Sequence, residues 1–61
     1  MDLQTKYESK TKEVEQQLQL IKLIIKKHNR KFKQEPNNWG YLGDLGYVSD
    51  KLNEIIQFIR V

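Results

Sequence analysis

The chain has 61 residues, a formal net charge of +3 at pH 7 and no cysteine. A chain this short forms at most one domain, so we expect a single domain over residues 1–61, close to the size at which one chain barely stabilises itself. The lack of cysteine excludes disulfides and thiolate metal ligands, and the single histidine does not make a metal site alone. Oligomerisation is the remaining means of stabilisation.

The charge is unevenly distributed along the chain. Residues 1–15 hold four acids and three bases (−1), residues 16–36 six bases and one acid (+5), and residues 37–61 three acids and two bases (−1). No secretory signal precedes the body of the chain, and the longest apolar run, Leu23-Ile24-Ile25, is far shorter than the roughly 20 residues of a membrane span. We therefore expect a soluble cytoplasmic protein that does not associate with membranes.

Apolar residues in the first half recur at alternating steps of four and three, which places them on one side of an α-helix. Thr5 and Glu8 have the spacing of a capping box, in which each side chain accepts a hydrogen bond from the backbone amide of the other residue. We predict a helix from about residue 5, or a turn earlier from Asp2, to about residue 33. The residues that we expect to form the interface of a helical bundle on this helix are Val14, Leu18, Ile21 and Ile25.

A turn is predicted over about residues 34–38. Pro36 disfavours helix at the preceding residue and has no amide hydrogen to continue a helical ladder. Asn38 offers a side-chain oxygen to the amides that begin the next helix. Because the connection is short, the two helices are expected to run antiparallel.

The second helix is predicted over about residues 39–60, but residues 39–47 allow two structures. A continuous helix is favoured because the apolar residues then fall within an arc of about 100°. A glycine-rich loop, followed by a short helix capped by Ser49, is the alternative, since Gly40, Gly43 and Gly46 each cost about 0.8–1 kcal/mol relative to alanine in a helix. The expected interface residues on this helix are Leu45, Val48, Leu52, Ile55 and Ile59.

These elements predict an all-α fold: an antiparallel two-helix hairpin, two copies of which form a four-helix bundle. We expect the chain to associate with itself as a homodimer or tetramer. Leu20 and Leu23 point away from the apolar stripe of the first helix, so they indicate a second contact surface. In a continuous second helix the glycines lie opposite its stripe, between Trp39 and Tyr47, where another helix could approach closely. The candidate surface for an unidentified partner protein is therefore Leu20, Leu23, Trp39, Gly43 and Tyr47.

A second candidate site is basic. Its cations repel one another at four-residue spacing, which is typical of a surface that binds an anionic partner such as nucleic acid. The structural alternative is that cations near the C-terminus of a helix are stabilised by the helix dipole. The candidate contacts are Lys26, Lys27, Arg30, Lys31 and Lys33.

Catalytic, metal and cofactor sites are not predicted. His28 has no Ser, Cys or carboxylate at a spacing that would complete a catalytic group, so we interpret it as the edge of the apolar stripe. Asp50 and Glu54 share a helix face but supply too few ligands for a cation site. The sequence thus favours a non-enzymatic protein–protein interaction or regulatory module; the alternatives are a nucleic-acid-binding regulator and a small subunit of a larger complex.

Overall fold

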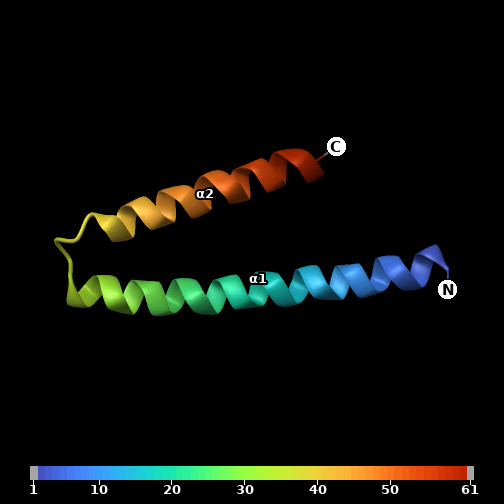
Figure 1. Cartoon of the computed structure of the whole chain (residues 1–61), viewed down its shortest axis with the longest axis horizontal. Coiled ribbons are helices and arrows are strands. Elements are labelled where there is room, and N and C mark those ends of the chain that lie inside the picture. The colour runs from blue at the N-terminus through green and yellow to red at the C-terminus, as the bar shows by residue number, and fades with distance from the viewer. Residues whose placement is uncertain (1, 61) are drawn as a thin grey trace. The chain divides into compact units, whose positions relative to one another are not determined.

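The computed structural model describes residues 2–60. They form two α-helices, α1 (Leu3–Gln34) and α2 (Gly40–Ile59), and no β-strand (Figure 1). The all-α class and the two predicted helices are therefore confirmed. The chain divides into two compact units, and the division lies within α1, between Arg30 and Lys31.

Helix α1 begins at Leu3, which agrees with the earlier of the two expected starts, the one from Asp2, and not with the start at residue 5. The Asp2 carboxylate accepts a hydrogen bond from the backbone amide of Thr5 at 2.8 Å, and the amide of Lys6 donates to the Asp2 carbonyl at 3.3 Å. The predicted capping box of Thr5 and Glu8 is thus wrong, because Thr5 already lies inside the first turn. A carboxylate at the N-terminus also interacts favourably with the helix dipole, which explains why Asp2 takes this position.

The connection between the helices is short and ordered by side chains at both of its ends. Helix α1 ends at Gln34, two residues before Pro36, as the proline predicts. The Tyr41 hydroxyl donates a hydrogen bond to Glu35 Oε2 at 2.7 Å, and the Tyr41 ring meets Phe32 edge-to-face at a centroid distance of 6.2 Å. These contacts tie the last turn of α1 to the first turn of α2.

Helix α2 starts beside the predicted capping residue. Asn38 Oδ1 accepts the backbone amide of Gly40 at 2.9 Å, and the residue at the N-cap position, Trp39, makes no side-chain cap of its own. Asn38 therefore does supply a cap, from one residue further out than the N-cap position. A Cβ atom at residue 40 would lie 3.0 Å from Asn38 Oδ1, so glycine leaves room for this contact.

Residues 40–47 are helical, which decides between the two structures that the sequence allowed. Helix α2 continues without interruption from Gly40 to Ile59, and the amide of Arg60 closes its last turn on the carbonyl of Ile56 at 3.1 Å. All three glycines adopt negative φ angles, so none of them is used for a left-handed turn. In the part of the chain that the structure describes, no helix is long and apolar enough to cross a membrane.

Candidate functional site

The apolar stripe of α1 is only partly covered. Ile25 and His28 are half-buried, whereas the stripe residues closer to the N-terminus are more exposed, from 36% for Ile21 to 72% for Tyr7. Helical spacing places all of them on one side of α1. This side offers a continuous apolar surface for another helix.

Helix α2 carries a second apolar stripe. Leu45, Val48 and Leu52 are half-buried, and Ile55 and Ile59 are exposed, with Ile59 retaining 74% of its accessible surface. No residue between 2 and 60 is buried. The described part of the chain therefore lacks an interior, and the nine predicted interface residues keep apolar surface available for association.

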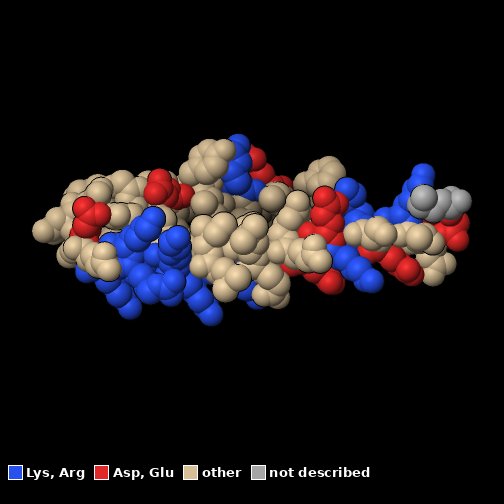
Figure 2. Space-filling model, turned by 60° about the horizontal axis from the view of Figure 1, so that its bottom comes forward, with Lys and Arg blue, Asp and Glu red and all other residues tan. Residues whose placement is uncertain are grey.

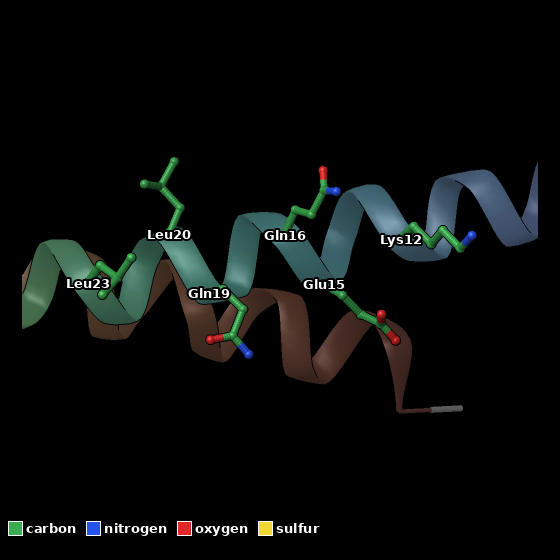
Figure 3. Close-up of a pocket in the computed structure, with 6 residues that line it drawn as sticks. All are labelled: Lys12, Glu15, Gln16, Gln19, Leu20 and Leu23. Carbon is green, nitrogen blue, oxygen red and sulfur yellow. The ribbon is translucent and has the colours of Figure 1, made fainter.

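The opposite side of α1 carries the predicted second surface. Leu20 and Leu23 border a shallow hollow of about 480 Å³ on α1 (Figure 3). Leu20 and Gln16 project to one side of the helix there, and Glu15 and Gln19 project to the other. Leu23 is 62% exposed. Polar side chains thus border the hollow toward its N-terminal end, and the two leucines border its C-terminal end.

On α2, the exposed aromatic side chains lie away from the apolar stripe. Trp39 is 80% and Tyr47 66% exposed, and the Lys51 ammonium lies 5.6 Å from the centroid of the Tyr47 ring. Apart from the two adjacent residues and the backbone of α2 itself, nothing comes within 4 Å of a Cβ built at Gly43. The surface around Gly43 and Tyr47 is therefore open, as a docking surface requires.

Phe58 belongs with these aromatic residues but was not predicted as a candidate. Its side chain is 82% exposed, and it lies eleven residues, close to three full turns, after Tyr47, which places both on one face of α2. The sequence contained a signal for the exposed position of Phe58, because this residue lies off the apolar stripe and four residues after Glu54, on the same side of the helix. Being a large apolar residue near Ile55, Ile56 and Ile59, it is easily assigned to their stripe.

The basic residues gather over the C-terminal part of α1, where Figure 2 shows them as one continuous patch. No acidic residue lies between Glu15 and Glu35 in the sequence. The ion pair of Lys10 with Glu13 at 2.6 Å and that of Lys51 with Glu54 at 3.5 Å both lie outside this part of α1. We call this patch the basic segment; its members are Lys22, Lys26, Lys27, Arg30, Lys31 and Lys33.

The titratable groups with shifted pKa values lie at the helix ends. The Thr5 amide hydrogen bond lowers the pKa of Asp2 from its ordinary value. The pKa of Tyr41 is raised, chiefly because its hydroxyl donates to Glu35. Both shifts belong to contacts that shape the helix ends. His28 Nδ1 is shielded from solvent on the apolar side of α1, where the sequence placed it.

Groups of three or more His, Asp or Glu side chains that could hold a metal ion are absent between residues 2 and 60. The chain was also compared with known proteins. No protein-family model matches it, and neither a curated protein nor a solved structure shows significant similarity.

Proposed function

We propose that the chain is a non-enzymatic association module, a helical hairpin that pairs with a second copy through its apolar stripes to form a four-helix bundle. The observation that carries this proposal is the exposed stripe on each helix in a chain with no buried residue between 2 and 60. Burying apolar surface is the main favourable term in both folding and association. Two amphipathic helices of this kind are most stable when a second pair covers their open sides.

The unequal lengths of the helices support the same proposal. Helix α1 has 32 residues and α2 has 20, which correspond to about 48 Å and 30 Å. Helix α2 alone therefore leaves about 18 Å of the α1 stripe without a partner wherever it packs. Residues such as Tyr7 and Val14 then need another molecule to cover them.

Sedimentation of the purified chain across a dilution series tests this proposal, with helix content followed by circular dichroism. At micromolar concentration, and at a salt concentration high enough to screen charged contacts, we expect the mass of two chains. On dilution, the mass and the helix content should fall together, since isolated helices are marginally stable in water. A single-chain mass that keeps full helicity at every concentration would contradict the proposal.

A matched pair of variants makes the test specific to the stripe. Leu18→Asp places a charge in the proposed interface and should abolish the oligomer, because an unpaired charge is costly to remove from water. Gln19→Asp places the same charge one residue further along α1, outside the stripe, and should leave the mass unchanged. Equal behaviour of the two variants would show that the stripe is not the interface.

The basic segment favours a second candidate function, the binding of nucleic acid. Six cations within 12 residues, with no acid among them, form a site that phosphate groups neutralise well. Titration with single-stranded RNA and duplex DNA at two salt concentrations tests this candidate. Binding should weaken steeply with salt and be lost in Lys26→Glu/Lys27→Glu, while Lys6→Glu/Lys10→Glu retains it. Absence of binding at low salt removes this candidate.

A further inference from the structure

Each helix carries a second face, opposite its apolar stripe, and the two second faces differ in charge. On α1 this face holds Leu23, Lys26 and Arg30, which follow one another at steps of three and four residues. On α2 it holds Asp50, Glu54 and Phe58, which follow one another at steps of four. Residues at such spacing lie above one another on a helix surface. We call these surfaces the basic face of α1 and the acidic face of α2.

The basic face of α1 combines cations with an apolar end. Lys26 and Arg30 belong to the basic segment, and Leu23 closes the apolar end of the hollow in Figure 3. Toward the C-terminus, Lys31 and Lys33 extend the positive charge to the last turn of α1. The order along α1 is therefore apolar first and basic afterwards.

The acidic face of α2 has the reverse order. Asp50 and Glu54 come first, and the 82% exposed Phe58 follows one turn later. Lys51 lies at the edge of this face, where it contacts Glu54 at 3.5 Å and the Tyr47 ring. Both residues of that ion pair are more than half exposed, so the pair is weak and leaves the carboxylate accessible.

The spacings of the two faces match in an antiparallel crossing. Asp50 and Glu54 are about 6 Å apart along their axis, as are Lys26 and Arg30. With Glu54 opposite Lys26, Asp50 meets Arg30. Phe58 then lies about 6 Å beyond Glu54, and Leu23 lies about 4.5 Å beyond Lys26, so their side chains meet within about 1.5 Å of the same level. One register thus aligns both charge pairs and the apolar pair.

We infer that the acidic face of α2 in one copy docks on the basic face of α1 in another copy. This inference rests on the proposed function, because it requires the apolar stripes to be occupied by the bundle. Complementary charge argues for a second copy as the occupant, since the chain itself supplies the pattern that fits its basic face. The contact joins two different surfaces, so each docked bundle still has an unoccupied basic face and an unoccupied acidic face. Further bundles can therefore add to them and build a larger assembly.

A charge exchange between two variants tests the contact. Variant A, Asp50→Lys/Glu54→Lys, makes both faces basic, and variant B, Lys26→Glu/Arg30→Glu, makes both faces acidic. We expect the native chain to form species larger than the bundle at about 50 mM salt and to lose them at about 500 mM, where charges are screened within about 4 Å. Variants A and B, each alone, should need at least about tenfold higher concentration for the same assembly.

Mixing the two variants is the decisive step, because each then offers the face that the other lacks. An equimolar mixture of A and B should recover the larger species. The controls reverse the same number of charges outside the register: Glu8→Lys/Glu13→Lys for A and Lys6→Glu/Lys10→Glu for B. These controls should assemble like the native chain. Assembly of A or B alone at the native concentration, or no recovery on mixing, would overturn the inference.

A crosslink reports the register directly, since the chain has no cysteine of its own. Chains with Leu23→Cys and chains with Phe58→Cys, mixed and oxidised, should form a mixed disulfide between copies. Asn53→Cys, which lies about 140° from Phe58 around α2, should not crosslink to Leu23→Cys. Equal crosslinking of Leu23→Cys to Phe58→Cys and to Asn53→Cys would contradict the proposed register.

The same measurements separate the two proposals. A species of two chains that never grows larger at low salt overturns the inference and leaves the proposed function standing. A single-chain mass at both salt concentrations overturns the proposed function itself.

Discussion

Single residues at the helix ends determine where α1 and α2 begin. The start of α1 is set by the Asp2 carboxylate, and that of α2 by Asn38, through hydrogen bonds to backbone amides of 2.8 Å and 2.9 Å. The first amides of a helix have no partner within the helix, so a nearby oxygen decides which residue becomes the first. The chain has several such oxygens close together, including those of Asp2 and Thr5, which is why the sequence left two possible starts for α1 and the later one was wrong.

The Asp2 cap predicts a pH dependence at the start of α1. Because the Thr5 amide lowers the pKa of Asp2 below its ordinary value of 3.8, the cap stabilises the helix fully above that value. Its contribution is lost as the pH falls through the lower, folded-state pKa. The Cα chemical shifts of residues 3–6 should therefore move toward random-coil values on acidification. In Asp2→Asn, which keeps an acceptor but does not titrate, the same shifts should stay constant; an unchanged titration in that variant would contradict this account.

The glycines of α2 predict unequal effects of the same substitution. Apart from the two adjacent residues and the backbone of α2 itself, nothing lies within 4 Å of a Cβ at Gly46, so Gly46→Ala should stabilise the chain by about 1 kcal/mol through helix propensity alone. At residue 40 a Cβ lies 3.0 Å from Asn38 Oδ1 and strains the cap. Gly40→Ala should therefore gain clearly less. Urea denaturation of both variants at one chain concentration measures the difference, and equal gains would show that the Asn38 contact is unimportant.

At the scale of helices, the sequence predicted α1 well because one apolar stripe extends over its whole length. Its end at Gln34 followed from Pro36, which acts through local sterics alone. Residues 40–47 could not be decided in the same way. Three glycines disfavour the helix by about 3 kcal/mol in sum. Tyr41 favours it through contacts with Glu35 and Phe32, beyond its own helix, and such contacts are not visible in a local pattern.

One of these contacts, between Tyr41 and Glu35, carries a prediction about the connection between α1 and α2. The hydroxyl donates to the carboxylate at 2.7 Å, which raises the pKa of Tyr41. Its stabilising effect is therefore fully present below the ordinary tyrosine pKa of about 10 and is lost as the pH rises through the folded-state pKa. In Glu35→Gln the pKa of Tyr41, measured from its Cζ chemical shift, should fall toward the ordinary value. Tyr41→Phe keeps the ring contact with Phe32 and should retain the turn; an unchanged Tyr41 pKa in Glu35→Gln would contradict the role of the carboxylate.

At the scale of the molecule, the candidate surfaces could be predicted only in part. Helical periodicity identified the stripe residues and the outward position of Leu20 and Leu23, because both follow from the 3.6-residue repeat. Phe58 was missed because it is near the isoleucines in sequence and lies beside their stripe rather than within it. What each surface contacts depends on another molecule, and one chain's periodicity carries no information about that partner.

Two aspartate substitutions, two residues apart on α1, distinguish the roles of its two faces. Ile21 lies on the apolar stripe, 36% exposed, and Leu23 on the opposite face, 62% exposed. Ile21→Asp should abolish the bundle and most of the helix content, because a charge buried without a partner costs several kcal/mol and small domains have only about 5–15 kcal/mol in total. Leu23→Asp should preserve the helix content and the bundle mass and remove only the larger, salt-sensitive species. Sedimentation and circular dichroism at matched concentrations measure both effects. The two variants place the same charge on the same helix, so they differ only in the face that carries it. Loss of the bundle in Leu23→Asp would mean that the two faces of α1 do not act separately. The division of the molecule into a stripe interface and a charged interface would then have to be abandoned.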